Sequence, residues 1–571
     1  MVAVLRFVHM QASIAKNRKP LVLGLVIGTL LLGCDVAGLF VTEDNSGETN
    51  GDSTNSGSTP SCDRGPGPEE PGDYDSVITV TNANDSGTGS LRAALSAPGS
   101  AEAVVFDSNL EDATILLDSE LYVETGITID GGNAPDLTLS GNEQHRVFRI
   151  ESNIDVTLRN LTIVDGRANN SGEIDPDLSR GRGGAIITEN EARLTIENST
   201  LKGNIGDQGG AVFSGYKASL IVRSSLFENN QSQGNTQQNG GTGVLTGGAI
   251  SAQGETTGEL RVHDSVFRGN TGVNGGAIGV IHTAVTIDNS TFTDNGTVVT
   301  SDSEQTNGHG GAIYTDGASG KQNGVADGGE IRITNSLITN NQAYHEGGGA
   351  LLFTYDPDTV TIEGTSFEGN TVKHRDGYGA FGGGLRNGGG AITIRNSAFI
   401  NNVSENKGGG IYLDNYSPGT IENTTVSGNV AREPDNGGGQ GGGIMVATDD
   451  PVTLRQVTIA ENTARFQGGG FSGKGDNTTL IDSIFDRNVA ENNGNNWDIK
   501  HHTTDALQDG GGNYQWPAKN PDDSTDLNVT STVNIADPNL GELTRDEECG
   551  PTYHPVPNDS PAAGKGAQSV P

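Results

Sequence analysis

A nine-residue phrase ending in asparagine recurs along this 571-residue chain and constrains its fold more than any other feature. The phrase reads apolar, any, polar or small, Ser/Thr-like, any, apolar, two polar or small residues and Asn, as in Ile196-Glu-Asn-Ser-Thr-Leu-Lys-Gly-Asn204. Self-similarity at a regular period is the sequence signature of a solenoid. The ten copies end at Asn204, Asn230, Asn270, Asn295, Asn341, Asn370, Asn402, Asn429, Asn462 and Asn488.

The pattern within each repeat predicts strands rather than helices. The shortest steps between successive asparagines are 25 to 27 residues, and we interpret the longer steps as loop insertions. Apolar residues alternate with polar ones, as at Leu194 and Ile196, and a period of two indicates β-strand. Most copies are followed by a phrase such as Gly310-Gly311-Ala312-Ile313, whose glycines allow tight turns. We therefore predict an all-β, right-handed parallel β-helix of about 11 or more coils, each with about three short strands.

The repeated asparagines and glycines are predicted to be structural. Stacked coils bring equivalent positions within about 4.8 Å of each other. The ten asparagines would then form a ladder in which each side chain bonds to the next. The composition fits this architecture, because only 32% of the residues are hydrophobic and each coil of a solenoid buries side chains only against its neighbours.

The two flanks of the repeat region differ from it in pattern. Residues 76–490 are predicted to form the β-helix, with an N-terminal cap at about 76–112. Within this cap, residues 87–98 are expected to contain a short amphipathic helix that starts at Ser90. Residues 491–571 lose the repeat and are rich in Asp, Asn and Pro, so we predict a C-terminal covering segment there.

Residues 1–33 are predicted to be a lipoprotein signal peptide. Basic residues precede an apolar stretch, which ends in a tetrapeptide that resembles the bacterial lipobox and places lipid attachment at Cys34. An uncleaved membrane anchor is the alternative, but Asp35 interrupts the apolar run and leaves it too short to cross a bilayer. Residues 34–75 would form an acidic, Gly/Ser-rich tether. We expect an exported protein anchored at the outer membrane or cell surface; Asp35 also leaves inner-membrane retention open.

The net charge limits the binding partners of the protein, and the cysteines allow one disulfide. The formal net charge of −38 argues against nucleic acid as a partner and leaves the lipid anchor as the membrane contact. The sequence contains no recognised calcium-binding loop, so we predict no cofactor, with bound calcium as the alternative. Cys62 and Cys549 flank the repeats, and export permits a disulfide between them. Such a bridge requires one flank to fold back along the body.

One group of side chains is a candidate catalytic site. His345 and His374 both lie four residues past a ladder asparagine, so adjacent coils would stack their imidazoles. Glu346 and Asp376 lie beside them, and His309 precedes the glycine pair of the coil before. This group could act in acid–base catalysis or bind a metal, although a solvated turn is the favoured interpretation and no metal is predicted.

A second carboxylate pair follows two tyrosines. Asp316 comes two residues after Tyr314, and Asp414 two residues after Tyr412. The tyrosines could stack on sugar rings or simply pack against neighbouring residues. No Walker A loop, HExxH helix or GxSxG elbow is present to indicate a particular reaction.

Three stretches resemble known bacterial β-helix proteins. The segment from Ile78 to Ala94 is similar to the N-terminal region of CSLREA-type proteins, although Gly89 and Ala93 replace the cysteine and the acid of that motif. The Gly-Gly-Ala-Ile and Phe-x-x-Asn phrases resemble the repeats of chlamydial polymorphic outer membrane proteins. The tail, residues 536–564, resembles the choice-of-anchor Q region. These resemblances imply a secreted, surface-exposed β-helix and assign no activity.

Three functions remain open at this point. We favour a non-catalytic adhesin, a rod that binds a polysaccharide or a surface protein of a host or neighbouring cell. The alternative is a polysaccharide lyase or glycoside hydrolase, because pectate lyases and polygalacturonases use the same scaffold. The third is a structural component of the envelope or matrix. Whether the protein is an enzyme is left uncertain, with the non-catalytic reading favoured.

Overall fold

The computed structural model divides the chain into two compact units, Met1–Ser58 and Thr59–Pro571, and every residue it describes belongs to the second. The predicted signal peptide, Cys34, Asp35, Cys62, Asp376 and Cys549 lie outside the described residues. No helix in the described part of the chain is long and apolar enough to cross a membrane. The described ranges are 65–67, 70–168, 181–234, 247–255, 257–299, 308–319, 328–374, 379–432, 438–545 and 550–564.

Each complete coil contains four short strands, rather than the three expected from the repeat. One coil consists of β12 (Arg193–Glu197), β13 (Thr200–Lys202), β14 (Ile205–Gly206) and β15 (Val212–Tyr216). Each pairs in parallel with its counterpart on the next coil. The extra strand follows the ladder asparagine and has only two residues, which is too short to show an alternation in the sequence.

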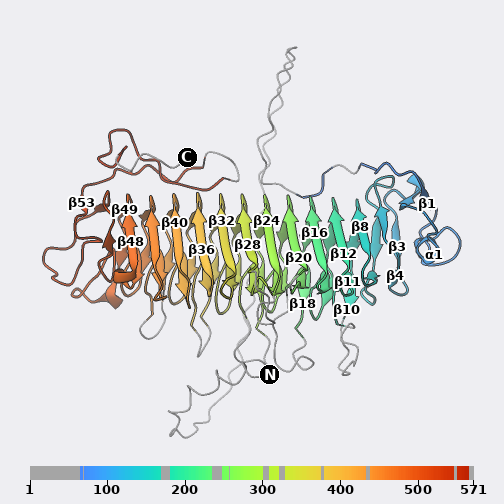
Figure 1. Ribbon diagram of the computed structural model, residues 1–571, viewed down its shortest axis with the longest axis horizontal. Coiled ribbons are helices and arrows are strands. Elements are labelled where there is room, and N and C mark those ends of the chain that lie inside the picture. Colours follow the sequence, from blue (N-terminus) through green and yellow to red (C-terminus); the bar gives the residue numbers. More distant parts are fainter. Residues whose placement is uncertain are drawn as a thin grey trace, which may run out of the picture. The chain divides into compact units, whose positions relative to one another are not determined.

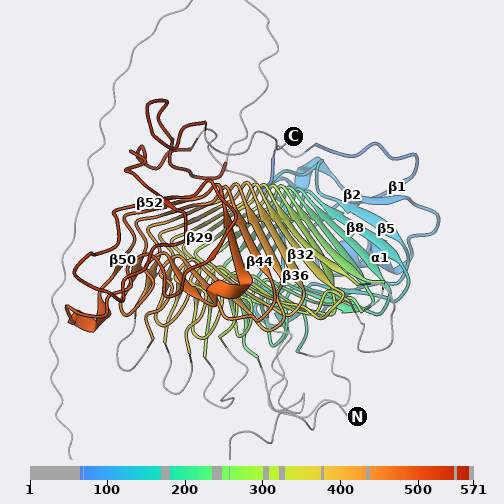
Figure 2. The same cartoon turned by 60° about the vertical axis from the view of Figure 1, so that its left-hand side comes forward.

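The coils stack into four parallel sheets, and the predicted parallel β-helix is confirmed. Figure 1 shows the stack running from β1 to β53, and Figure 2 shows the coils one behind another. Among the described residues, sheet A has 15 strands, from β1 (Val77–Val80) to β51 (Gln508–Asp509), and sheet B has 15, from β3 (Thr114–Leu116) to β53 (Asn534–Ile535). Sheet D has 11, from β10 (Arg167–Ala168) to β50 (Val489–Ala490).

Sheet C has 12 strands in the described residues and carries the candidate site discussed below. Its strands are β4 (Leu121–Val123), β7 (Phe148–Ile150), β11 (Ile186–Thr188), β15, β19 (Ile250–Gln253), β23 (Ile278–Ile281), β27 (Ile313–Asp316), β31 (Ala350–Phe353), β35 (Leu385–Gly388), β39 (Ile411–Asp414), β43 (Ile444–Val446) and β47 (Phe471–Gly473).

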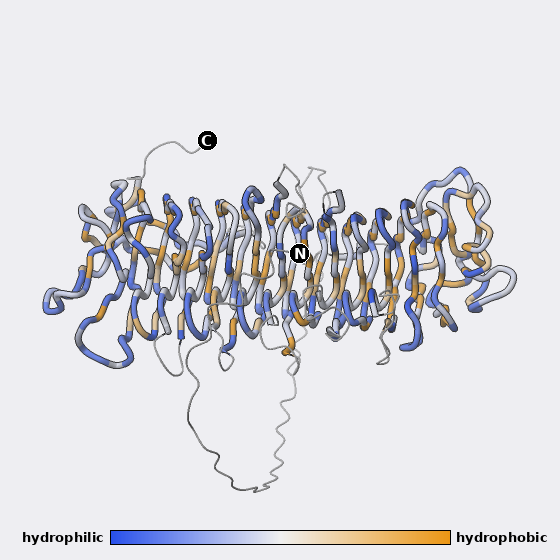
Figure 3. The backbone as a smooth tube through the Cα atoms, turned by 60° about the horizontal axis from the view of Figure 1, so that its bottom comes forward, coloured by the Kyte–Doolittle hydropathy of each residue, from blue (hydrophilic) through white to orange (hydrophobic). Residues whose placement is uncertain are grey.

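The core is one continuous column of apolar side chains inside the coils. The alternation in β12 buries Leu194 and Ile196 completely, and Figure 3 shows apolar positions recurring from coil to coil. Equivalent phenylalanines lie face to face. The ring centroids of Phe227 and Phe267 are 4.7 Å apart, and those of Phe267 and Phe292 are 4.8 Å apart. These distances match the spacing of the paired strands, so the sheet register itself positions the rings.

The ten repeated asparagines form a buried row, each at most 2% exposed. At each of the nine steps, the side-chain Nδ2 of one asparagine donates to the Oδ1 of the next over 2.9–3.0 Å. The same Oδ1 also accepts from the backbone N–H of the previous asparagine, as from Asn341 to Asn370 at 3.0 Å. The asparagine side chains thereby provide hydrogen-bond partners for buried amides at a turn, where strand pairing does not supply them.

The N-terminal cap contains the predicted helix, α1 (Leu91–Ser96). The side chain of Ser90 caps it by accepting from the backbone N–H of Ala93 over 3.2 Å. The helix buries Leu91, Ala94 and Leu95 and contacts β1 and β4. The short helical cap is therefore confirmed, and it contacts the first strands of sheets A and C.

Strand stacking continues past residue 490, where the repeat predicted its end. β51 pairs with β48 (Thr478–Ile481), and β52 (Tyr514–Trp516) pairs with β49 (Ile484–Asp486). These last strands keep the backbone pairing without the asparagine phrase, so the sequence pattern ends before the fold does.

The chain then turns back along the outside of the coils (Figure 1 and Figure 2). Arg545 forms an ion pair with Glu368 of β33 (Ser366–Glu368). Further along, His554 Nε2 lies 2.8 Å from the Oγ of Ser427. The C-terminal segment is thus held against sheet B, far from its neighbours in sequence.

Candidate functional site

Polar and aromatic side chains gather on the outer face of sheet C, between β27 and β39. Ile313, Leu385 and Ile411 begin their strands facing the core. Because side chains alternate along a strand, the next residue of each points outward. The register aligns two outward columns over four coils: Tyr314, Leu351, Arg386 and Tyr412, and then Asp316, Phe353, Gly388 and Asp414.

A further column runs beside sheet C, at the residue that precedes each glycine turn. His309 bridges to Glu346 on the next coil, and Glu346 bridges to Phe381. The turn needs glycine at Gly310, which has φ of +64° and where a Cβ would lie 2.1 Å from the carbonyl oxygen of Ile313. The paired glycines of the repeat therefore place His309 and Glu346 side by side, 37 residues apart in the sequence.

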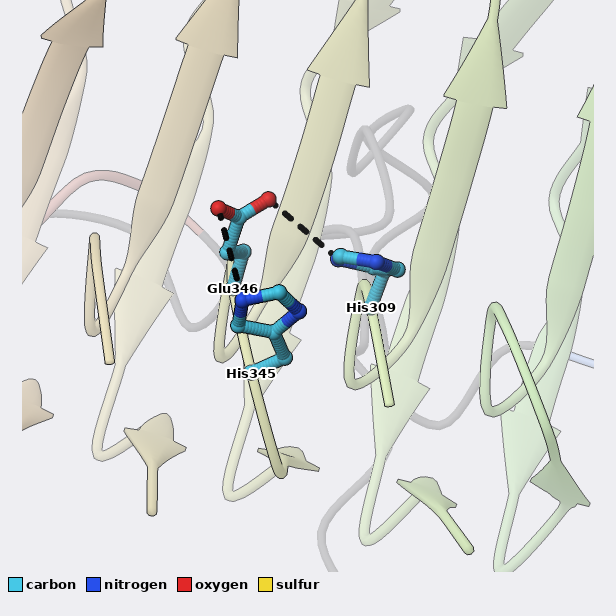
Figure 4. Close-up of side chains that lie close together, drawn as sticks. All are labelled: His309, His345 and Glu346. Atoms are coloured by element: carbon cyan, nitrogen blue, oxygen red, sulfur yellow. Dashed lines mark ion pairs between the residues drawn. The ribbon is translucent and has the colours of Figure 1, made fainter. Parts of the chain in front are cut away.

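Glu346 is the centre of a network of charges (Figure 4). Its Oε2 lies 3.2 Å from His309 Nδ1 and accepts a short hydrogen bond from the Arg386 guanidinium. Its Oε1 faces His345 Nε2 at 3.9 Å. The second guanidinium nitrogen of Arg386 donates to Asp414 over 3.0 Å. One arginine thus joins two carboxylates from the coils on either side of it.

This network is largely shielded from solvent, since the side chains of Glu346 and Arg386 are each 10% exposed. Burial by itself would raise the pKa of Glu346. The polar contact with His309 and the positive charge of Arg386 outweigh burial and lower the pKa to about 2. Glu346 is therefore ionised at neutral pH and cannot act as a general acid there.

Tyr314 and Tyr412, for which sugar stacking and ordinary packing were both considered, are packed rather than open. Phe381 stacks on Tyr412 with ring centroids 4.9 Å apart, and Tyr314 is buried as well. Burial is the main cause that raises the pKa of both phenols, so both stay neutral. Tyr416 is an open ring, 83% exposed in the turn two residues after Asp414. Sequence reasoning missed it, because it lies outside the repeated phrases.

The structure brings together only part of the predicted histidine column. The ring beside His345 belongs to His309, with centroids 4.5 Å apart, and not to His374. His374 is exposed, and its backbone N–H donates to the Glu405 carboxylate over 2.6 Å. The predicted stacking of His345 on His374 is therefore wrong.

Loop length explains the difference. The turn glycine Gly347 follows its ladder asparagine after six residues, whereas Gly382 follows Asn370 after twelve. His374 therefore stands at the start of an insertion, and Phe381 takes the position equivalent to Glu346. Asp376 belongs to the same insertion and lies outside the described residues.

The group formed by His309, His345 and Glu346 could hold a metal ion. One ligand atom from each residue lies within 4.8 Å of the other two. Two imidazoles and one carboxylate form a donor set typical of divalent transition metals. Its chemistry differs from the all-oxygen sites that bind calcium.

Comparison with known protein families finds one repeat family in this chain. Residues 289–316 and 396–414 match the Chlamydia polymorphic membrane protein repeat. The first match ends at Asp316 and the second at Asp414, so both run into sheet C beside the charge network. No curated protein matches the chain. The fold and these matches define a parallel β-helix protein that carries Chlamydia polymorphic membrane protein repeats.

Two solved structures are similar in fold. Tailspike protein 3 of bacteriophage CBA120 is 12% identical, with a TM-score of 0.36; the match covers 81% of this chain and 64% of the tailspike chain, which is less than two thirds of it. PfbA, a surface adhesin of Streptococcus pneumoniae, is 14% identical, with a TM-score of 0.32 and coverage of 80% and 91%. Neither likeness extends beyond the fold.

Proposed function

We propose that this protein is a non-catalytic, surface-exposed β-helix that binds a glycan on the outer face of sheet C, around Tyr416. The observation that carries the proposal is a solvent-exposed aromatic ring two residues from Asp414, whose carboxylate belongs to the closed charge network. The Chlamydia polymorphic membrane protein repeats support a surface location. The lipobox-like sequence at Cys34 supports attachment there through a lipid.

The charge network favours binding over catalysis. A glycoside hydrolase needs one protonated and one ionised carboxyl group flanking the bond. Here Glu346 has a pKa of about 2 and is paired with Arg386. A lyase needs a positive charge free to neutralise a uronate, whereas the charge of Arg386 is shared between Glu346 and Asp414.

The chemistry around Tyr416 suits a sugar. An exposed tyrosine offers an apolar ring face and a hydroxyl group, so it can pack against the C–H face of a sugar while bonding to its hydroxyls. Asn415 adds an amide in the same turn, while both oxygens of the Asp414 carboxylate already accept hydrogen bonds, from Arg386 and from the backbone N–H of Asn415. A polar group beside an aromatic surface is typical of sites that orient a small polar ligand.

The test uses the purified protein and a panel of immobilised neutral and acidic polysaccharides. Tyr416→Asn removes the ring but keeps a residue that tolerates the φ of +56° found there. Trp497→Ala is the control, because Trp497 is also exposed, at 67%, but lies beyond the repeats and outside sheet C. We expect retention of the wild type and of Trp497→Ala, and at least about tenfold weaker retention of Tyr416→Asn.

Equal retention of Tyr416→Asn would contradict the proposed binding face. The same incubations report on catalysis, because hydrolysis creates new reducing ends and lyase action creates unsaturated ends. Either product would overturn the non-catalytic proposal and favour the polysaccharide lyase or hydrolase considered from the sequence.

A further inference from the structure

We propose that His309, His345 and Glu346 form a binding site for one divalent transition-metal ion of the zinc class. The site joins two adjacent coils, since His309 comes from the coil that contains β27 and the other two residues come from the next. This goes beyond glycan binding at Tyr416, which requires no metal.

The distances approach those of a coordinated ion, with all three ligand atoms within 4.8 Å of one another. Zinc ligands lie about 2.0–2.2 Å from the ion, so neighbouring ligands of a tetrahedral site lie about 3.3 Å from each other. His309 Nδ1 and Glu346 Oε2 are 3.2 Å apart, close to this value, and His345 Nε2 is 3.9 Å from Oε1. His345 has the most exposed side chain of the three, so a rotation of that side chain can close the remaining gap.

The surroundings support a ligand rather than a simple ion pair. His309 Nδ1 is buried, and its contact is Glu346 Oε2 at 3.2 Å, in an orientation that does not meet hydrogen-bond geometry. A metal ion placed between these two atoms would take a lone pair from each, without requiring the angle of a hydrogen bond.

The residues around Glu346 also suit its role as a ligand. Arg386 holds the carboxylate in place and is itself held by Asp414, in the manner of the outer residues that orient metal-binding carboxylates. Glu346, Asp414 and Arg386 together carry a net charge of −1. A divalent cation therefore enters a site of opposite sign, in a chain of net charge −38.

Three protein ligands leave at least one coordination position open. The imidazole donors select zinc, cobalt, nickel or copper over calcium, which prefers oxygen ligands throughout. The site is thus distinct from the calcium binding that the acidic composition suggested.

The experiment measures Zn²⁺ binding to the full chain, purified without a histidine tag and stripped with EDTA, by isothermal titration calorimetry and by metal analysis after dialysis. His345→Ala removes one ligand, and His374→Ala is the matched control, an exposed histidine at the equivalent distance from its ladder asparagine. We expect one Zn²⁺ per chain for the wild type and for His374→Ala, and binding at least tenfold weaker for His345→Ala.

Co²⁺ added to the wild type supplies a second readout that needs no variant. Bound cobalt with nitrogen and oxygen ligands should absorb in the visible range, Zn²⁺ should displace it, and Ca²⁺ should not. If the wild type binds no Zn²⁺, or if His345→Ala binds it as tightly as the wild type does, the site does not exist. His345→Gln, which keeps a polar side chain, repeats the test should the alanine variant fail to fold.

Discussion

The side chain of Asn341 donates a hydrogen bond to the Oδ1 of Asn370 on the next coil, 3.0 Å away and 29 residues along the chain. The same oxygen accepts the backbone N–H of Asn341, so one carboxamide satisfies two donors of the neighbouring coil. The side-chain nitrogen of Asn370 donates to the backbone carbonyl of Ile338 and to the Oδ1 of Asn402. Each asparagine of the row is therefore bonded on both sides, and the row acts as a continuous buried seam.

Replacing one asparagine of this row should destabilise the β-helix strongly. Asn370→Ala removes the acceptor of the buried backbone N–H of Asn341, one of the two acceptors of its side-chain amide, and the side-chain donor to the carbonyl of Ile338. Each unsatisfied buried group costs about 1–3 kcal/mol, so we expect a loss of about 3 kcal/mol or more in the free energy of unfolding. Urea unfolding followed by circular dichroism measures it. Asn495→Ala, at an exposed position, should change stability by less than about 0.5 kcal/mol.

The phenylalanine stacks should contribute beyond simple burial. Phe267 lies between two stacked rings, whereas Phe399 stacks on Phe367 at 4.8 Å. Truncating a buried phenylalanine to alanine costs about 3–5 kcal/mol, and each aromatic pair adds about 0.5–1.5 kcal/mol. Phe267→Ala should therefore be the more damaging change, by about 1 kcal/mol, in thermal and urea unfolding. Equal losses in the two variants would show that area alone decides the stability.

Asp486 should make stability fall as the pH rises. It is 0% exposed, and burial raises its pKa from 3.8 to about 6, against the lowering effect of Arg487. The folded state therefore binds a proton more tightly than the unfolded state, and stability is lost as the pH rises from about 4 through 6. Asp486→Asn removes this loss, which amounts to at most about 3 kcal/mol for a shift of this size.

The measurement compares the melting temperature of Asp486→Asn with that of the wild type at pH 4 and pH 7.5. The variant should gain relative to the wild type only at the higher pH. Asp522→Asn, an exposed control near the same end of the chain, should show no such difference. A gain that is equal at both pH values would mean that Asp486 is not the titrating group.

The C-terminal segment should loosen when its anchor on sheet B is removed. Glu368 contacts both Arg545 and the hydroxyl of Thr552, which donates over 2.8 Å. Glu368→Gln weakens a partly exposed ion pair worth about 1 kcal/mol, so the stacked strands should stay intact. Amide hydrogen exchange should rise severalfold in residues 541–556 and remain unchanged in β12 and β16 (Ser219–Arg223).

Glu461→Gln breaks an exposed ion pair with Arg487 and serves as the matched control. It should leave exchange in residues 541–556 unchanged. Equal exchange in the wild type and in Glu368→Gln would mean that His554, bonded to Ser427, holds the segment without help from Glu368.

The local features of the fold could be predicted from the sequence. The alternation at Leu194 and Ile196 indicated strands, and the 25-residue spacing indicated stacked coils, because both express the backbone geometry of a single repeat. Ser90 marked the start of α1 for the same reason, since capping involves only neighbouring residues. The asparagine row followed once identical positions were placed above one another.

The candidate site depended on relationships between coils. Whether His345 meets His309 or His374 is decided by the spacing from the ladder asparagine to the turn glycine, which is six positions in one coil and twelve in the next. The pairing of Arg386 with Glu346 and Asp414 needs the register of three successive coils, and the return of Arg545 to Glu368 spans 177 residues. The sequence by itself determined the strands, their period and the stacking, because these follow from local backbone preferences. Only the tertiary structure decided which charged side chains meet. Insertions of unequal length shift the residues of one coil relative to the next, so the sequence spacing does not show which side chains face each other.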